Sequence, residues 1–298
     1  MKGAPLNQLP DLPCYLNGVF QPLGEARVSP MDRGFLFGDG VYELIPAYGG
    51  RLFRFDAHME RLEHGLARLR IANPLSRAQW LGVLRELIAS LEAPAHALYL
   101  QVTRGVAMRS HLIPADIVPT AFAFANRLQP VAEADRHHGV ACVTARDFRW
   151  ERGDIKSTSL LGNVLARQIA TDAGAAETIM LRDGFLTEAS SANVWIVKEG
   201  ALLGPPRSEH VLEGVRFELL RELCEECGIA CNRRPISEAE LLGADEILLS
   251  SAGREVLAVT KLDNEPVGHG ALHGKPGPVY ARLYEAYQRA KASPLNLT

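Results

Sequence analysis

Residues 150–164 have the sequence WERGDIKSTSLLGNV, in which a polar stretch leads directly into an apolar one. The apolar positions continue with helical spacing, so the sequence predicts a helix over 160–173. Lys156 stands just before this helix, where its amine could lie in a cleft and act as a Schiff-base nucleophile. The competing interpretation is a solvated lysine ahead of a helix N-cap, with Ser157 or Thr158 as the cap.

The segments on both sides of this stretch alternate between hairpins and helices. Strand pairs flank turns at 17–18 and 183–184, whereas Leu62, Leu66 and Leu69 share one face of a helix. We expect strands at 14–16, 19–20, 41–47, 51–55, 96–103, 120–126, 140–144, 177–181, 185–187, 193–197 and 201–203, and further helices at 57–70, 77–92, 215–227, 237–242 and 277–292. This pattern predicts an α+β fold with mixed or antiparallel sheets.

The length of 298 residues suits two domains or one large one. After a loose N-terminal arm, the best linker candidate is 128–138, which is polar and contains a proline. We therefore expect a smaller N-terminal domain over 1–127 and a larger C-terminal domain over 139–298.

Composition excludes several classes of function. The net charge is −3 and the basic residues are scattered, so no nucleic-acid footprint is present. No apolar run approaches the roughly 18 residues of a membrane span, and no secretory signal opens the chain, so we expect a cytoplasmic protein. Five loosely spaced cysteines do not indicate a disulfide framework. The CxxC at 224–227 falls in a predicted helix, where plain thiols are a simpler interpretation than a metal or redox site.

A second polar cluster, LTEASSANV at 186–194, lies between two apolar strands. Glu188 could hold a proton on a pyridine-type nitrogen, and the hydroxyls and amides after it, Ser191 among them, could bind an anion. The alternative is a polar loop with local serine turns.

Other segments carry candidate binding groups. The glycines of GDG at 38–40 could permit close approach of a ligand or simply form a turn. Arg61, on the helix predicted over 57–70, is either a phosphate-binding residue or a surface residue. Arg109 and His111 follow a strand two residues apart, so both could face one carboxylate, which arginine binds bidentately. A solvated loop is the competing interpretation there.

As a set, these segments resemble the fold-type IV pyridoxal-phosphate enzymes, and within them the D-amino acid aminotransferases. The resemblance runs from about residue 15 to about residue 288. The segments that carry it are DRGFLFGDGVYE at 32–43, HMERL at 58–62, QVTRG at 101–105, DIKS at 154–157 and TEASSANV at 187–194. The resemblance implies two α/β domains with pyridoxal phosphate in the cleft between them.

The resemblance also implies roles for the residues that would hold the cofactor. Lys156 would form the Schiff base with it and carry the proton during the reaction. Glu188 would keep the pyridine nitrogen protonated. Ser191 would be a further cofactor-binding residue, and Arg61 would bind the phosphate.

The same resemblance implies the substrates and the assembly. A D-amino acid would donate its amino group to a 2-oxo acid in two half-reactions. Tyr42, Arg109 and His111 would bind the substrate carboxylate. In the family the last two reach over from the neighbouring subunit, so the resemblance implies an obligate homodimer.

The sequence departs from the family pattern at two phosphate-binding segments. Gly214-Val215 is followed by Arg216 where the family usually has threonine, so Arg216 would either supply charge to the phosphate or point elsewhere. A helix start there would still offer backbone amides. Ser251 is kept, but Ala252 replaces a hydroxyl residue, so phosphate binding would depend more on Arg61 and backbone N–H groups.

Other activities stay open. A branched-chain L-amino acid aminotransferase, an (R)-amine transaminase and an aminodeoxychorismate lyase would share Lys156 and Glu188 but hold the carboxylate differently. The spacing of Arg109 and His111 favours the D-amino acid branch. A non-catalytic protein on the same fold would be expected to lose Lys156, Glu188 or Arg61, and all three are present.

Overall fold

The structure, a computed structural model, describes residues 9–298; the first part of the predicted N-terminal arm, 1–8, lies outside the described residues. By its internal contacts the chain divides into two compact units. Among the described residues, unit 1 contains 9–129 together with 155–159 and 294–298, and unit 2 contains 130–154 and 160–293. The Lys156 segment therefore belongs to unit 1, although it follows the predicted linker. The domain boundaries predicted from the sequence stay a prediction.

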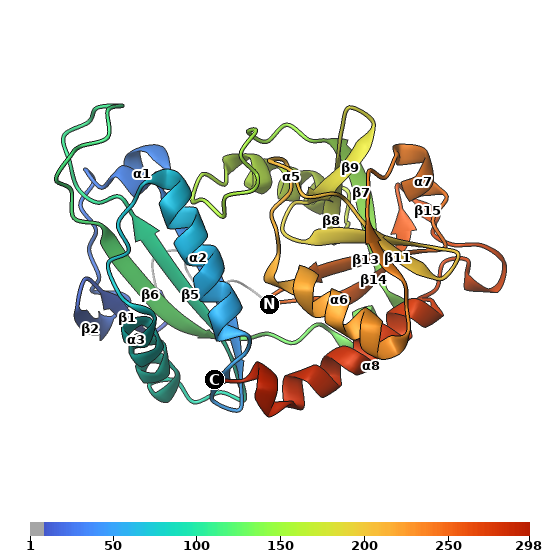
Figure 1. The fold of residues 1–298 in the computed structure, drawn as a ribbon, viewed down its shortest axis with the longest axis horizontal. Coiled ribbons are helices and arrows are strands. Elements are labelled where there is room, and N and C mark those ends of the chain that lie inside the picture. Colours follow the sequence, from blue (N-terminus) through green and yellow to red (C-terminus); the bar gives the residue numbers. More distant parts are fainter. Residues whose placement is uncertain (1–8) are drawn as a thin grey trace. The chain divides into compact units, whose positions relative to one another are not determined.

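Unit 1 is an antiparallel sheet of six strands in the order β2-β1-β6-β5-β3-β4. Its strands are β1 (Pro13–Leu16), β2 (Val19–Pro22), β3 (Gly40–Tyr48), β4 (Arg51–Leu52), β5 (Ala95–Thr103) and β6 (Thr120–Arg127), and its helices are α1 (Arg33–Phe37), α2 (Phe55–Leu69) and α3 (Arg77–Ala89) (Figure 1).

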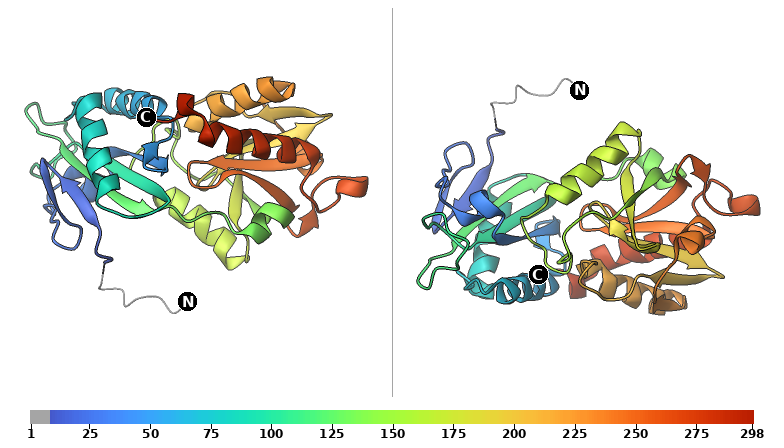
Figure 2. Two further views of the ribbon diagram at one scale, coloured as in Figure 1. Left: turned by 90° about the horizontal axis from the view of Figure 1, so that it is seen from below. Right: turned by 90° about the horizontal axis from the view of Figure 1, so that it is seen from above.

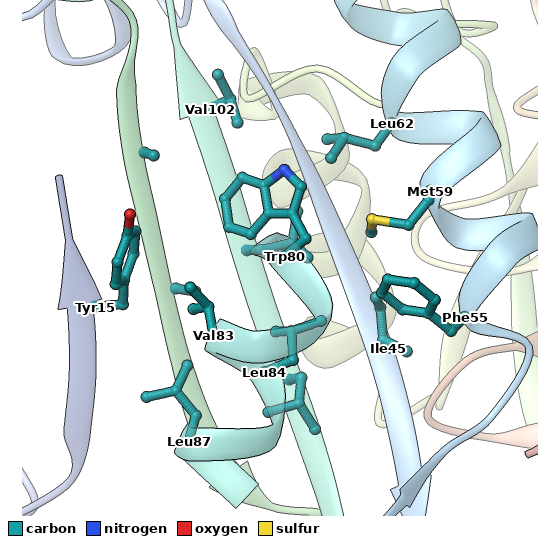
Figure 3. Packing of buried hydrophobic residues seen from close by; sticks show 14 of the residues in the cluster. Tyr15, Ile45, Phe55, Met59, Leu62, Trp80, Val83, Leu84, Leu87 and Val102 are labelled. Carbon is teal, nitrogen blue, oxygen red and sulfur yellow. The ribbon is translucent and has the colours of Figure 1, made fainter. Parts of the chain in front are cut away.

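Helices α2 and α3 cover one face of this sheet because alternate strand residues are apolar. Trp80 of α3 is fully buried and packs with Met59 of α2 and Ile45 of β3 (Figure 3). The other face of the sheet is aromatic: the rings of Tyr42 and Tyr99 stack with their centroids 5.6 Å apart. Tyr42 therefore faces away from the helices.

Unit 2 is a mixed sheet of nine strands in the order β12-β11-β10-β13-β14-β7-β8-β9, with β15 paired to β14. Its strands are β7 (Val140–Arg146), β8 (Glu177–Arg182), β9 (Phe185–Ala189), β10 (Asn193–Lys198), β11 (Ala201–Gly204), β12 (Cys231–Arg233), β13 (Glu246–Ser251), β14 (Glu255–Leu262) and β15 (Glu265–Pro266). Its helices are α4 (Glu133–His138), α5 (Leu161–Asp172), α6 (Val215–Cys227), α7 (Glu238–Leu242) and α8 (Pro278–Ala292), of which α6 and α8 lie side by side (Figure 2). The predicted α+β class with antiparallel and mixed sheets is confirmed.

The structure corrects several predicted elements. The strand expected over 51–55 ends at Leu52, because Arg54 adopts a left-handed conformation (φ 59°) and α2 begins at Phe55. The polar stretch 128–138 contains α4, whose Arg136 donates to the Val256 carbonyl oxygen (2.7 Å). Strands β13 and β14 were not individually predicted. No helix within residues 9–298 combines the length and apolar character needed to cross a membrane.

Candidate active site

The Lys156 segment adds to the open edge of β3. Strand β4 pairs only with the end of β3, from Ala47 on, so the beginning of β3 is accessible on that side. The Tyr42 N–H donates to the Lys156 carbonyl oxygen (3.0 Å), and the Thr158 N–H donates to the Gly40 carbonyl oxygen (2.9 Å). The backbone of Lys156 is therefore fixed on both sides.

The Lys156 side chain lies over an aromatic ring. Its Nζ atom is 4.0 Å from the centroid of the Tyr42 ring, and within unit 1 it makes no hydrogen bond or ion pair. Neither Ser157 nor Thr158 caps α5, whose N-cap is Leu160. The interpretation of Lys156 as a residue ahead of a serine or threonine cap is therefore wrong.

The GDG glycines permit this approach. Gly38 has φ 66°, and a Cβ atom there would lie 2.5 Å from Ser159 Oγ. At Gly40 a Cβ atom would lie 2.7 Å from the Val102 carbonyl oxygen. The sequence left a turn and the close approach of a ligand as alternatives. The structure shows the turn at Gly38, and it also shows close approach by the segment that carries Lys156; the approach of a ligand stays a prediction.

Asp39, between these glycines, is bound by two buried arginines. Arg33 Nε donates to Asp39 Oδ2 (2.8 Å), and Arg104 donates to both carboxylate oxygens (2.7 and 2.9 Å). Burial raises the pKa of Asp39, but these bonds lower it more, so the carboxyl stays ionised. The cluster fixes the loop that leads into β3.

Arg61 pairs with a carboxylate that the sequence analysis did not single out. From α2 it donates to both oxygens of Glu43 (2.6 and 2.7 Å), and His58 Nδ1 lies 2.8 Å from Glu43 Oε2. Glu43 and His58 are fully buried. Burial raises the pKa of Glu43, but Arg61 and then His58 lower it far below its ordinary value. Glu43 is therefore a permanent anion that orients the guanidinium of Arg61.

Arg109 and His111 lie on an exposed loop of unit 1. Both lie near the Phe37 ring: Arg109 Cζ is 5.6 Å from the centroid of this ring, and the centroid of the His111 ring is also 5.6 Å from it. Arg33 Nη1 also donates to the Ser110 carbonyl oxygen (2.6 Å). The structure thus brings Arg109 and His111 together and leaves both side chains exposed.

Glu188 is a buried carboxylate at the end of β9 in unit 2. Arg149 Nη1 donates to one of its oxygens, and the Leu212 N–H (3.0 Å) and Asn193 Nδ2 (3.4 Å) donate to the other. Burial raises the pKa of Glu188, and Arg149 and Leu212 only partly offset this. A buried acceptor of this kind suits a cationic N–H donor.

Ser191 contacts a second buried carboxylate. The hydroxyls of Ser190 and Ser191 both donate to Glu177, which Arg254 also approaches (3.2 Å). Ser191 itself is exposed. Its hydroxyl hydrogen is therefore directed at Glu177, and its oxygen lone pairs are left to accept a bond.

The start of α6 offers backbone donors. Its N-cap is Gly214 and no side chain caps it, so the first N–H groups, at Val215 and Arg216, are available to an anion. The Arg216 guanidinium is buried. Burial raises the pKa of the Tyr287 hydroxyl of α8, and the nearby charge of Arg216 lowers this pKa in part. A Cβ atom at Gly214 would lie 2.1 Å from Asn193 Oδ1, so the glycine admits the residue that also bonds Glu188.

The last predicted phosphate-binding segment lies between β13 and β14. Ser251 Oγ accepts from the Arg254 N–H (3.2 Å), and Ser251 and Ala252 are both partly exposed. The Ala252 methyl adds no hydrogen-bonding group to this turn.

Comparison with known proteins identifies the family. Residues 40–262 match the model of the family described as amino-transferase class IV. The chain belongs to the class IV aminotransferases. It is 38% identical to a D-alanine aminotransferase of Bacillus licheniformis over 92% of this chain and 95% of that protein. A D-alanine aminotransferase of Staphylococcus haemolyticus is 36% identical, with 92% and 96% covered.

Solved structures show the same fold. A T.th. branched-chain amino acid aminotransferase, solved with pyridoxamine 5′-phosphate, superposes with a TM-score of 0.90 at 23% identity, covering 98% of this chain and 99% of that one. The branched-chain aminotransferase of Thermoproteus uzoniensis gives 0.86 at 22% identity, covering 96% and 98%. Class IV aminotransferases use pyridoxal phosphate, so the predicted enzyme class and cofactor are confirmed.

The residues present fit this cofactor. Lys156 offers an amine without an ion pair in its unit, Glu188 offers a buried acceptor, and α6 offers an uncapped N-terminus. Sequence reasoning missed Arg149 and its partner Asp147. Their side chains are buried, whereas the apolar side chains of Phe148 and Trp150 are exposed, so the polarity of this segment gave no signal for them.

Proposed function

We propose that this class IV aminotransferase transfers the amino group of a D-amino acid to a 2-oxo acid. Two observations support the proposal. Its curated relatives at 34–38% identity are named D-alanine aminotransferases. Arg109 and His111, the predicted carboxylate-binding pair, both lie close to the Phe37 ring.

The cofactor, when bound, supplies an electron-accepting ring that stabilises negative charge on the substrate Cα. Lys156 Nζ binds the cofactor and moves the proton that leaves Cα. Glu188 holds a proton at the ring nitrogen, and Arg61 with the first N–H groups of α6 binds the phosphate. Tyr42 fixes the position of the Lys156 amine through its ring, and Arg109 with His111 binds the substrate carboxylate.

We further propose that the enzyme acts as a homodimer, and exposed apolar side chains support this. In unit 1 the loop after β5 exposes Val106, Met108, Leu112, Ile113 and Val118, each at least half accessible. In unit 2, helix α5 turns small residues inward and exposes Leu161, Val164, Leu165 and Ile169 on one stripe. Apolar surfaces of this kind on a folded chain mark interfaces, and a second copy is the occupant we propose.

A coupled assay tests the substrate class. Purified protein with pyridoxal phosphate and 2-oxoglutarate would be offered D-alanine, L-leucine and (R)-1-phenylethylamine in parallel. The proposal predicts turnover with D-alanine and not with the other two. Turnover with L-leucine or the amine alone would move the protein to another branch of the family and deprive Arg109 and His111 of their proposed role.

A further inference from the structure

Behind Glu188 lies a chain of alternating charges. Arg149 donates from Nε and Nη2 to the two oxygens of Asp147 (3.0 and 2.8 Å), and its Nη1 donates to Glu188. The side chains of Arg149, Asp147 and Glu188 are 5, 0 and 8% exposed. A buried arginine therefore joins two buried carboxylates.

Further bonds fix this chain in one geometry. Asp147 also accepts from the Arg149 N–H (3.0 Å) and from Thr187 Oγ1 (2.9 Å), and Arg149 Nη2 donates to the His210 carbonyl oxygen (3.1 Å). At Gly162 a Cβ atom would lie 3.0 Å from Arg149 Cγ. The glycine in the first turn of α5 therefore lets the helix pack directly on the arginine stem.

With Glu188 ionised, the charges of Asp147, Arg149 and Glu188 sum to minus one, and Arg182 is a further cation 3.6 Å from Asp147. Burial raises the pKa of Asp147, but its bonds with Arg149 lower it more, so Asp147 is an anion. Burial lowers the pKa of Arg149, but Asp147 and Glu188 raise it more, so Arg149 is a cation. Without Arg149, Glu188 would be a buried carboxyl that favours its neutral, protonated form. If Arg149 were present without Asp147, its positive charge would cancel the negative charge of Glu188.

We propose that Arg149, paired with Asp147, is the positioning residue that keeps Glu188 ionised and directs its negative charge at the ring nitrogen of the cofactor. This inference rests on the proposed pairing of Glu188 with that nitrogen, and it does not depend on the substrate. Arg149 touches neither substrate nor cofactor in this account; it acts through Glu188.

The test reads the protonation of the ring nitrogen directly. Protein loaded with pyridoxal phosphate labelled with ¹⁵N in the ring would be examined by NMR between pH 6 and 9, in the wild type and in five variants. Arg149→Met removes the cation, Arg149→Lys restores it without the forked geometry, and Asp147→Asn removes the outer anion. The matched control is Arg182→Met: Arg182 approaches Asp147 (3.6 Å) and donates to the Arg149 carbonyl oxygen (2.9 Å), but it has no bond to Glu188.

The wild type and Arg182→Met are expected to keep the nitrogen protonated throughout. Arg149→Met is expected to shift the signal to the unprotonated form and to raise the cofactor Kd about tenfold, which is the effect of losing one hydrogen bond to a charged group. Arg149→Lys should recover part of the signal of the protonated nitrogen and part of the cofactor affinity. Asp147→Asn should lower the pH at which the nitrogen loses its proton. Folding of each variant would be checked by thermal unfolding of the cofactor-free protein.

Two outcomes would overturn the inference. One is a folded Arg149→Met with the wild-type signal and Kd. The other applies if Arg149→Met does not fold: wild-type signals in Arg149→Lys and Asp147→Asn would then exclude the proposed role. Glu188→Gln separates this failure from that of the proposed function. If Glu188→Gln also leaves the nitrogen protonated, the proposed pairing of Glu188 with the cofactor is wrong. If Glu188→Gln changes the signal and the Arg149 variants do not, only the proposed role of Arg149 is wrong.

Discussion

Lys156 has a fixed backbone, and its amine makes no hydrogen bond or ion pair with the described residues of unit 1; this combination suits a nucleophile. Two hydrogen bonds join its segment to β3, while Nζ contacts only the face of the Tyr42 ring among the contacts of its unit. We expect Lys156→Ala to lower the transamination rate by at least about 10²–10⁴-fold, the usual effect of losing the proton carrier. Lys198→Ala, at an exposed hairpin end, is the control in the same coupled assay. Near-normal turnover of Lys156→Ala would contradict the assignment.

Gly38 is the residue at which the Lys156 segment approaches most closely. Gly38→Ala would combine a left-handed conformation, which costs a residue with a Cβ atom about 1 kcal/mol, with a contact of 2.5 Å to Ser159 Oγ. Gly49→Ala is the matched control, since it has φ 55° with nothing within 4 Å. In urea titrations we expect Gly38→Ala to lose more stability than Gly49→Ala, and only Gly38→Ala to lose activity. Equal losses in both would show that the close approach has no effect.

At the scale of elements, β3 and α2 are joined by the buried ion pair of Glu43 with Arg61. Removing one partner of a buried pair costs about 3–5 kcal/mol, so Glu43→Gln should destabilise the protein by that order at pH 7. Glu63→Gln is the control on α2, the helix that also carries Arg61. The ion pair of Glu63 with Arg77 is partly exposed and should contribute less than about 1 kcal/mol. Both variants would be measured by urea unfolding. Similar losses of unfolding free energy in the two would refute the larger contribution of the buried pair.

The same pair predicts a pH dependence with a definite sign. The pKa of Glu43 is lowered in the folded protein, so its contribution is complete above the ordinary glutamate pKa of about 4.3 and is lost progressively as pH falls below it. The free energy of unfolding should therefore fall between pH 5 and 3 more steeply in the wild type than in Glu43→Gln. Parallel curves for the two proteins would exclude this contribution.

Elements with strong local patterns could be predicted from the sequence, and long-range contacts could not. The leucine spacing at 62, 66 and 69 indicated α2, and α6 begins and ends where predicted. Helix α4 was missed because its residues are polar and none is buried. The pairing of Arg149 with Glu188 spans 39 residues, and no local pattern encodes it. The cofactor residues were predicted by resemblance, whereas the groups that orient them were found only in the structure.

At the scale of the whole molecule, the exposed apolar stripe of α5 predicts association of two copies. Leu165→Glu would place a charge in that interface and should convert a dimer into a monomer in light scattering. Ala281→Glu adds the same charge at an exposed position of α8, outside the stripe on α5, and should leave the dimer intact. A dimer that persists in Leu165→Glu would show that this stripe is not the interface.

The central claim is that one chain with its cofactor accepts the amino group of a D-amino acid. The most direct measurement mixes the cofactor-loaded protein with D-alanine in the absence of any 2-oxo acid and quantifies the pyruvate released. The account predicts about one pyruvate per chain from D-alanine, as a two-step transfer requires, and none from L-alanine. Release of pyruvate from L-alanine alone, or from neither enantiomer, would contradict it.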